Sequence, residues 1–359
     1  MRPAEVHEKI VRREGPWLWA AWALQPLAFA YGAGAVLNRL QWERGLRKPR
    51  HFDTVVVSVG NIEVGGVGKT PVTVSIAGTL AAMGLKTAVV ARNLCRGKHP
   101  PVAVRPGHSS GAVPISDEPV LLSRILGSCC PVYTAASKTD AVERAVRELK
   151  PAVVVVDNGF QHHRLYRNLD VVVLSADHPF GLGGLLPAGT MREPERVLGR
   201  ADYLWINGVT SQAQLSLAKR LIASRNWKAP FIASSVVPEK PVAPDGSVDR
   251  IGRVFAFCGI GKPDGFRHTL ERTGFELAGF HVYPDHWNYT EKEIDHLMEK
   301  QRSTGADYLI TTEKDAARLG SSMTRKMDLR VLPIRLSVLD STAFEDMLGR
   351  ILELAGEGR

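Results

Sequence analysis

The stretch VVVSVGNIEVGGVGKT, residues 55–70, decides the fold of this 359-residue chain. It begins as an apolar strand, turns at a glycine-rich run and ends in Lys69-Thr70. Because glycine accepts positive φ angles, such a turn can point backbone N–H groups inward. Those amides and the N-terminus of the following helix bind phosphate oxygens. The sequence therefore predicts a phosphate-binding loop between a strand and a helix.

The loop is a variant of the strict G-x-x-x-x-G-K-[ST] pattern, because Glu63 occupies the position of its first glycine. The chain has G-G-x-G-K-T instead, a form shared by kinases and switch ATPases. Lys69 is the candidate catalytic cation for the β- and γ-phosphates, and the Thr70 hydroxyl would hold Mg²⁺. A turn whose glycines serve only the chain reversal is the alternative. The residues expected to bind the nucleotide are Gly60, Asn61, Gly65, Gly66, Val67, Gly68, Lys69 and Thr70.

The elements after the loop predict an α/β fold. Apolar residues at helical spacing between positions 72 and 83 are followed by a second strand at 87–91. This βαβ start indicates a mostly parallel sheet with helices on both faces, of the phosphate-loop NTPase type. Residues 153–157 read VVVVD, which is typical of a strand buried on both faces. Asp157 at its end stands where such enzymes keep a second Mg²⁺-directing carboxylate.

Two long segments without regular structure are expected. Residues 92–118 are rich in Gly, Pro and basic side chains and end before a helix that runs to about residue 126. Residues 179–194 are rich in Gly and Pro, and a loop of this length in a compact domain is usually functional. Arg192 in this loop could neutralise transferred phosphate as a catalytic residue. Pairing of Arg192 with Glu193 or Glu195 is the alternative.

The length of the chain allows two domains. We expect a phosphate-loop core at 51–237 that is closed by a strand at 203–206. A joint with three prolines is expected at 238–249. Residues 250–359 repeat the strand–helix alternation up to a helix from Thr342, and they contain no phosphate loop. This smaller C-terminal α/β domain is therefore expected to close over the first.

Composition narrows the class of protein. Four cysteines without C-x-x-C spacing fit neither a disulfide framework nor a zinc site, and they favour a reducing cytosol. The net charge of +9 favours nucleotide, nucleic acid or an anionic membrane surface as partner. No aromatic-plus-basic recognition motif supports nucleic acid.

Residues 1–50 carry the signal for location. Positions 17–40 are rich in Trp, Leu and Ala and have basic residues on both sides. A transmembrane helix would be interrupted by Gln25-Pro26, and cleavage of a signal peptide would export an ATP-dependent domain to a compartment without ATP. We prefer an amphipathic helix in the membrane interface, with its basic flanks on anionic lipid. A helix packed on its own domain is the remaining alternative.

Taken together, these motifs resemble those of the tetraacyldisaccharide 4′-kinases, the lipid A 4′-kinases of Gram-negative bacteria. The resemblance implies transfer of the ATP γ-phosphoryl group to the 4′-hydroxyl of tetraacyldisaccharide 1-phosphate. It also implies a peripheral enzyme at the cytoplasmic face of the bacterial inner membrane, and a monomer is favoured. The matching blocks are residues 59–70, 117–119, 157–162, 179–181, 185–194, 257–263, 284–286 and 311–315.

The same resemblance assigns roles to further residues. Asp117 would be the general base, and His286 would orient it. Thr70, Glu118 and Asp157 would direct Mg²⁺, which prefers hard oxygen ligands. If Asp117 and His286 lie across the interdomain cleft, domain closure would assemble the site and exclude water.

The chain departs from the family pattern at two places. Asn158 stands where the family usually has a second Asp, and residues 91–95 read ARNLC where it usually has S-R-G-Y-G. We expect activity to survive, because the base, the phosphate loop and the first carboxylate remain.

Two rival functions stay open. A switch ATPase or GTPase of the same branch often has Lys where this chain has Val64. A kinase for a small soluble metabolite would leave the N-terminal aromatic helix unexplained.

Overall fold

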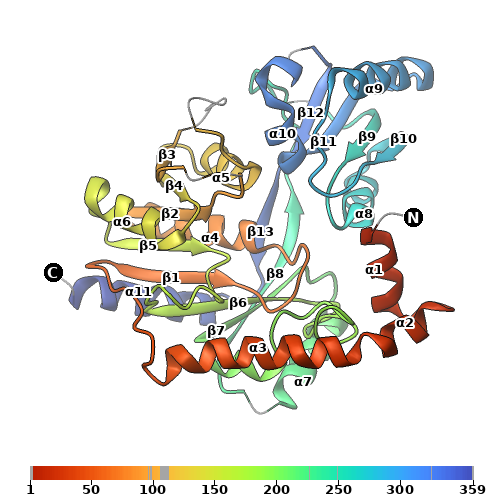
Figure 1. Cartoon of the computed structure of the whole chain (residues 1–359). Coiled ribbons are helices and arrows are strands. Elements are labelled where there is room, and N and C mark those ends of the chain that lie inside the picture. The colour runs from red at the N-terminus through yellow and green to blue at the C-terminus, as the bar shows by residue number, and fades with distance from the viewer. Residues whose placement is uncertain are drawn as a thin grey trace.

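The computed structural model describes residues 3–95, 97, 99–105, 113–225, 227–248, 250–324 and 326–357. Residues 106–112, part of the expected loop at 92–118, lie outside the described residues, as does residue 249, the end of the expected joint. The described elements gather around a large and a small sheet, with the helix at residues 25–43 along one side of the large one (Figure 1).

Within the described part of the chain, a nine-stranded sheet has the order β13-β8-β7-β6-β1-β5-β2-β4-β3. Its pairs are parallel except β3 with β4 and β8 with β13, so the expected mostly parallel sheet is confirmed. The strands are β1 (Val55–Gly60), β2 (Thr87–Arg92), β3 (Val102–Val104), β4 (Val132–Ala135), β5 (Val153–Asp157), β6 (Leu169–Ser175), β7 (Tyr203–Asn207), β8 (Phe231–Pro238) and β13 (Ile334–Val338).

β1 lies in the middle of this sheet, between β5 and β6. Its residues and those of β5 are all buried, as runs of valine predict for strands covered on both faces. In the parallel register Val59 pairs with Asp157. The phosphate loop and Asp157 therefore meet at the carboxyl edge of the sheet, where such sheets bind ligands.

Helices cover both faces of the sheet. Val57 belongs to a core shared with α4 (Lys69–Ala82), whereas Val56 belongs to a core shared with α6 (Lys138–Leu149). Because successive residues of a strand point to opposite faces, α4 and α6 lie on opposite sides of the sheet. The other elements around it are α5 (Asp117–Leu126), η1 (Glu195–Arg200), α7 (Gln212–Ala223) and α11 (Ser341–Glu357).

A four-stranded parallel sheet, counted over the described residues, forms the second α/β unit in the order β10-β9-β11-β12. A capping box of Thr290 and Glu293 opens the helix that follows β10. The elements are β9 (Arg253–Cys258), α8 (Pro263–Thr273), β10 (Glu276–Val282), α9 (Glu291–Thr304), β11 (Tyr308–Thr312), α10 (Glu313–Thr324) and β12 (Leu329–Leu332).

The C-terminal end of the chain corrects our expectation. We placed the helix from Thr342 in the second domain, but α11 packs on the nine-stranded sheet through Met347 and Ile351. β13, which we did not expect, pairs with β8 and returns the chain to this sheet. β7 does not close the first unit either, because β8 continues it. Strand–helix alternation cannot tell which sheet a terminal helix will cover, and here the apolar face of α11 is buried beside α4.

The N-terminal segment forms α1 (Pro3–Arg12), α2 (Trp17–Ala23) and α3 (Gln25–Glu43). α2 and α3 bend by 44° at their junction, and Pro26 stands in the first turn of α3. No single helix among the described residues is long and apolar enough to cross a bilayer. The bent pair of α2 and α3 together has the length and the apolar composition that a crossing requires. Trp19 is 78% exposed and Phe29 is 79% exposed.

Candidate active site

The phosphate-binding loop begins at Gly60, where β1 ends, and closes at Lys69, the first residue of α4. Gly68 has a φ of +83°, and a Cβ atom there would lie 2.0 Å from Nδ2 of Asn207. Only glycine fits this position, because the backbone is left-handed and a side chain has no room. The expected strand, turn and helix are confirmed.

Asn207, at the end of β7, fixes the loop from the neighbouring strands. Its Nδ2 donates to the carbonyl oxygen of Val67 at 2.9 Å, and its Oδ1 accepts from Oγ of Ser234 at 2.9 Å. We did not predict Asn207 from the sequence. Its place at the carboxyl end of a buried strand was the signal that could have identified it.

The loop at residues 179–194 lies against the phosphate loop. The N–H group of Val64 donates to the carbonyl oxygen of Thr190 at 2.8 Å, and the N–H group of Arg192 donates to that of Ile62 at 2.7 Å. These two hydrogen bonds hold the backbone of Arg192 beside the phosphate loop. A cation in this position can contact the phosphates that the loop binds.

The acidic neighbours of Arg192 have other partners. Glu193 lies 3.5 Å from Arg200, and Glu195 lies 3.1 Å from Arg225. The alternative, in which Arg192 only forms an ion pair with Glu193 or Glu195, is therefore not supported, because each carboxylate pairs with another arginine.

Positive and negative groups crowd together at the carboxyl edge of the sheet. Burial lowers the pKa of Lys69, and the charges of Asp157 and Glu118 oppose this shift. Burial raises the pKa of Asp157, which accepts a hydrogen bond from Oγ1 of Thr73 at 3.1 Å. Burial also raises the pKa of Glu118, and the charge of Asp157 adds to this effect. The structure thus brings Lys69, Glu118 and Asp157 into one electrostatic cluster.

The donor set fits Mg²⁺. Glu118 and Asp157 raise each other's energy as anions, so a divalent cation between them would relieve the repulsion. Thr70, in the first turn of α4, adds a hydroxyl oxygen. No group of three or more His, Cys, Asp or Glu side chains in the described residues could hold a metal ion.

Lys138, the first residue of α6, is a buried cation that we did not predict. Burial lowers its pKa to about 8, and the charge of Asp157 opposes the shift. Its Nζ donates to the carbonyl oxygen of Asn158. Asn158 has a φ of +53°, a conformation that Asn adopts more readily than most residues. Lys138 therefore holds the backbone of Asn158, the residue that differs from the usual family pattern.

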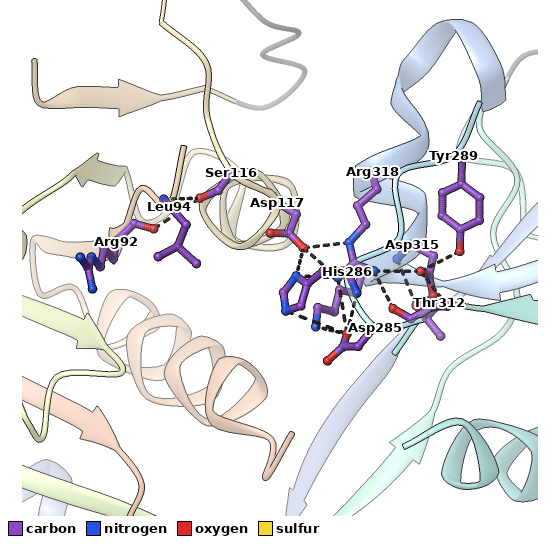
Figure 2. Close-up of polar contacts among 12 residues, drawn as sticks. Arg92, Leu94, Ser116, Asp117, Asp285, His286, Tyr289, Thr312, Asp315 and Arg318 are labelled. Carbon is purple, nitrogen blue, oxygen red and sulfur yellow. Dashed lines mark hydrogen bonds and ion pairs between the residues drawn. The ribbon is translucent and has the colours of Figure 1, made fainter. Parts of the chain in front are cut away.

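Asp117 and His286 meet between the two α/β units, as Figure 2 shows. Asp117 is the first residue of α5, and His286 follows β10. Nδ1 of His286 lies 3.1 Å from Oδ2 of Asp117. The predicted pair is thus in contact, which the large sequence separation alone could not establish.

Arg318 on α10 contacts both members of this pair (Figure 2). Its Nε donates to Oδ2 of Asp117 at 2.8 Å, and its Nη2 lies 3.2 Å from Nδ1 of His286. Its Nη1 donates to the buried Asp315 at 3.1 Å, and the Arg318 side chain is only 4% exposed. We did not predict Arg318. Its signal was its spacing of three residues after Asp315, which places both on one helix face.

The charges around Asp117 keep its carboxylate ionised. Burial by itself would raise the pKa of Asp117. The hydrogen bond with His286 and the charge of Arg318 outweigh burial and hold the pKa below its usual range. The carboxylate is therefore ionised, as a general base must be, but its low pKa makes it a weak base. It can take the proton of a hydroxyl group beside it only as that hydroxyl becomes acidic while its oxygen bonds to phosphorus.

The second departure from the family pattern lies directly beside Asp117. Oδ1 of the buried Asn93 accepts from the N–H group of Ser116 at 3.1 Å, and its Nδ2 donates to the carbonyl oxygen of Pro114 at 2.8 Å. Oγ of Ser116 accepts in turn from the N–H group of Leu94 at 3.2 Å (Figure 2). The residues that replace the usual glycine turn therefore anchor the start of α5.

The whole chain can be compared with known proteins. Residues 20–353 match the family model described as tetraacyldisaccharide-1-P 4′-kinase. A tetraacyldisaccharide 4′-kinase of an Anaeromyxobacter species is 35% identical, with 92% of this chain and 91% of the relative covered. The enzyme of the same name from Chlorobaculum parvum is 34% identical, with 93% and 95% covered.

The fold also has a solved counterpart. LpxK from Aquifex aeolicus, in a crystal structure in complex with ATP, superposes with a TM-score of 0.70 at 22% identity. The match covers 92% of this chain and 99% of that chain, and it supports the phosphate-loop kinase fold. Because the family model and the relatives span nearly the whole sequence, the chain belongs to the tetraacyldisaccharide 4′-kinase family.

Proposed function

We propose that this protein transfers the γ-phosphoryl group of ATP to the 4′-hydroxyl of tetraacyldisaccharide 1-phosphate in lipid A biosynthesis. Family membership supports the reaction and the substrate class. The contact between Asp117 and His286 is the observation that carries the proposal, because it places an ionised carboxylate that could accept a hydroxyl proton between the two α/β units. Family membership, and not this carboxylate, favours a kinase over a switch protein, because a hydrolase can direct such a group at water.

The transfer needs position, charge neutralisation and a proton acceptor. The 4′-oxygen forms a bond to the γ-phosphorus, the bond from that phosphorus to the bridging oxygen of ADP breaks, and the hydroxyl proton passes to Asp117. Lys69 and Arg192 neutralise the phosphoryl oxygens. General-base help of this kind contributes about 10²–10⁴-fold to the rate.

Thr70, Glu118 and Asp157 would hold Mg²⁺ in this proposal. When bound, the ion neutralises charge on the β- and γ-phosphates. The chain itself contributes the oxygen ligands, and the repulsion between Glu118 and Asp157 favours a cation beside them.

The second α/β unit supplies His286 and Arg318, whereas the nine-stranded unit supplies Asp117. Separation of the two units would therefore take the base apart, and their approach would restore it and exclude water from the reaction. The exposed aromatic residues of α2 and α3 support a peripheral position on the cytoplasmic face of the inner membrane, where the acylated substrate lies.

A direct assay tests this function. The purified protein is incubated with labelled ATP, Mg²⁺ and tetraacyldisaccharide 1-phosphate in detergent, and the products are separated. We expect a disaccharide that carries a new 4′-phosphate, and no labelled lipid with an acceptor whose 4′-position is already phosphorylated. Hydrolysis of ATP without a labelled lipid would overturn the proposal and favour the switch-protein alternative.

A further inference from the structure

Two of the blocks that match the family, residues 257–263 and 311–315, have no role in the reaction described above. The structure brings both blocks to the loop that carries His286. Gly259 of the first block follows β9, and Asp315 of the second lies in the first turn of α10. The carbonyl oxygen of Gly259 accepts from the N–H group of His286 at 3.3 Å. The two blocks therefore lie beside one member of the predicted pair.

Asp315 accepts hydrogen bonds from several elements of the second unit. It is 0% exposed. Its Oδ1 accepts from the N–H group of Gly259 at 3.0 Å and from the hydroxyl group of Tyr289 at 2.9 Å. Its Oδ2 accepts from Oγ1 of Thr312 at 2.7 Å (Figure 2). Because both oxygens have partners, the orientation of this buried carboxylate is fixed, and it can anchor a neighbouring cation.

The guanidinium group of Arg318 connects this anchor to the pair (Figure 2). Nη1 donates to Oδ1 of Asp315 at 3.1 Å and to the carbonyl oxygen of Gly259 at 2.7 Å. Nε donates to Oδ2 of Asp117 at 2.8 Å, and Nη2 lies 3.2 Å from Nδ1 of His286. A guanidinium group is planar and rigid, so it fixes the directions of its partners relative to one another. One side chain thus sets the position of Asp117 relative to His286.

The backbone of His286 needs support from its surroundings. Its φ is +59°, in the left-handed region, where a residue other than glycine is strained. Its N–H group lies 2.9 Å from Oδ1 of Asp285, and that carboxylate pairs with Lys314 at 3.2 Å. Gly259 approaches so closely that a Cβ atom there would lie 2.9 Å from the carbonyl oxygen of Pro284. Strained residues persist where the surrounding structure holds them, and they cluster at active sites.

We propose that Arg318 is a positioning residue for the phosphoryl transfer: it holds Asp117 and His286 at a fixed mutual position across the two α/β units, and Asp315 with Tyr289 holds Arg318. The assignment rests on the proposed function, because that function makes Asp117 the proton acceptor. Both contacts with Asp117 use Oδ2, and Oδ1 accepts no hydrogen bond from the described residues, so Oδ1 is free to take the proton. Arg318 thus acts on the rate through the pair and not through the nucleotide.

Arg318→Lys is the main variant. Lysine keeps the positive charge beside Asp315, but one ammonium group cannot replace the planar set of donors. The full chain is assayed with labelled ATP, Mg²⁺ and tetraacyldisaccharide 1-phosphate in detergent. We expect kcat to fall about 10²-fold, the usual cost of misplacing a reacting group by about 1 Å. The KM for ATP should stay unchanged.

Tyr289→Phe is the milder variant. It removes the hydroxyl group that donates to Asp315 and keeps the ring that packs on Phe257 and Tyr283. We expect kcat to fall about fivefold, the equivalent of one lost hydrogen bond, with an unchanged KM for ATP.

The matched control is Arg124→Lys. Arg124 on α5 donates through Nη1 to the carbonyl oxygen of Ala316 on α10 at 3.1 Å. It therefore joins the same two helices as Arg318, and no described hydrogen bond connects it to Asp117 or His286. Its kcat should match that of the wild type. Thermal unfolding shows whether each variant is folded at the assay temperature.

A double-variant cycle tests whether Arg318 acts through Asp117. In the Asp117→Asn background the proton acceptor is absent, so Arg318→Lys should lower the residual kcat no further. An equal fall in both backgrounds would overturn the inference, because Arg318 would then act independently of the base. Wild-type kcat in a folded Arg318→Lys would overturn it as well. If Arg318→Lys does not fold, the same cycle with Tyr289→Phe decides.

A measurement that needs no turnover separates this inference from the proposed function. In protein with isotope-labelled histidine, the ring-nitrogen signals of His286, assigned with His286→Gln, report the contacts of Nδ1. Arg318→Lys should shift these signals and Arg124→Lys should not. If the shift is seen but the wild type forms no phosphorylated disaccharide, the proposed function fails and the hold of Arg318 on His286 stands. Unchanged His286 signals in Arg318→Lys would overturn the inference.

Discussion

Nδ1 of His286 lies 3.1 Å from Oδ2 of Asp117, although 169 positions separate the two residues in the chain. One residue belongs to α5 beside the nine-stranded sheet, and the other follows β10 of the four-stranded sheet. The carboxylate that would accept the proton therefore depends on both α/β units for its position.

Asp117→Asn tests the base directly. The amide keeps the shape of the side chain but cannot accept the proton, so turnover should fall by about 10²–10⁴-fold. The Kd for ATP should stay near the wild-type value, because the phosphate loop does not contact this residue through any described hydrogen bond. Steady-state kinetics and nucleotide titration measure the two effects. Unchanged turnover would remove Asp117 from the reaction.

Arg318→Met should destabilise the fold. The substitution leaves the fully buried Asp315 without its ion-pair partner, and an uncompensated buried charge costs about 3–5 kcal/mol. The double variant Arg318→Met/Asp315→Asn removes that charge and should recover part of the loss. Urea unfolding measures the free energy of unfolding of both variants. Equal destabilisation of the single and the double variant would show that the ion pair does not determine the effect.

The sequence predicted the centre of the fold well because its signals there are local. A valine run before a glycine-rich turn identifies β1 and the phosphate loop, and the VVVVD run identifies β5. The prediction for α11 was wrong because the helix could pack on either of two sheets that are far from it in the sequence. The uncovered apolar surface of the nine-stranded sheet determines where it packs, and no local sequence pattern indicates that surface.

The candidate site shows the same division. Lys69, Asp117 and His286 stand in recognisable motifs, and the structure brings Asp117 and His286 into contact. Arg318 and Lys138 lie outside the motifs, and only packing reveals that each is buried against a carboxylate or a carbonyl group. A lone Arg or Lys in a helix usually faces solvent, so sequence alone gives no reason to select it.

Gly68→Ala should abolish nucleotide binding. The added methyl group would lie 2.0 Å from Nδ2 of Asn207, and the φ of +83° strains any residue with a side chain. The loop would have to shift away from Asn207, and its amides would lose their positions. Isothermal titration with ATP and Mg²⁺ measures the loss.

Gly78→Ala is the matched control on α4. No described heavy atom lies within 4 Å of an added Cβ there, and Ala in a helix interior is more stable than Gly by about 1 kcal/mol. This variant should bind ATP like the wild type and unfold at a slightly higher temperature. Weakened ATP binding in Gly78→Ala would mean that any change on α4 disturbs the loop.

Phe29→Ser should weaken membrane binding. Burial of a phenylalanine side chain contributes about 1.5–3 kcal/mol, so loss of this exposed residue should lower the partition coefficient onto anionic phospholipid vesicles about tenfold or more. Met83→Ser changes an apolar residue that is exposed at the end of α4, and its partition should equal that of the wild type. Co-sedimentation with vesicles measures both. Equal losses in the two variants would indicate non-specific adsorption.

The half-buried His162 should make stability depend on pH. Burial lowers the pKa of His162 to about 4, and the charges of Lys138 and Arg167 add to the shift. In the unfolded chain the imidazole has its ordinary pKa of about 6.5. Between about pH 6.5 and 4 the unfolded chain therefore binds a proton that the folded protein excludes. This contribution to the free energy of unfolding is fully present above pH 6.5 and falls as the pH approaches 4.

His162→Gln isolates the contribution of the imidazole to the pH dependence. In the wild type Nε2 of His162 lies 3.0 Å from Oγ1 of Thr139, and Gln can keep this hydrogen bond but does not titrate. Relative to the wild type, this variant should gain free energy of unfolding as the pH falls from 7 to 4.5. Urea unfolding at several pH values measures the difference, and His268→Gln on the exposed surface of α8 serves as the control. A difference between His162→Gln and the wild type that stays constant with pH would mean that the folded protein admits the proton at His162. In that case partial burial and the charges of Lys138 and Arg167 would not suffice to keep the His162 ring neutral.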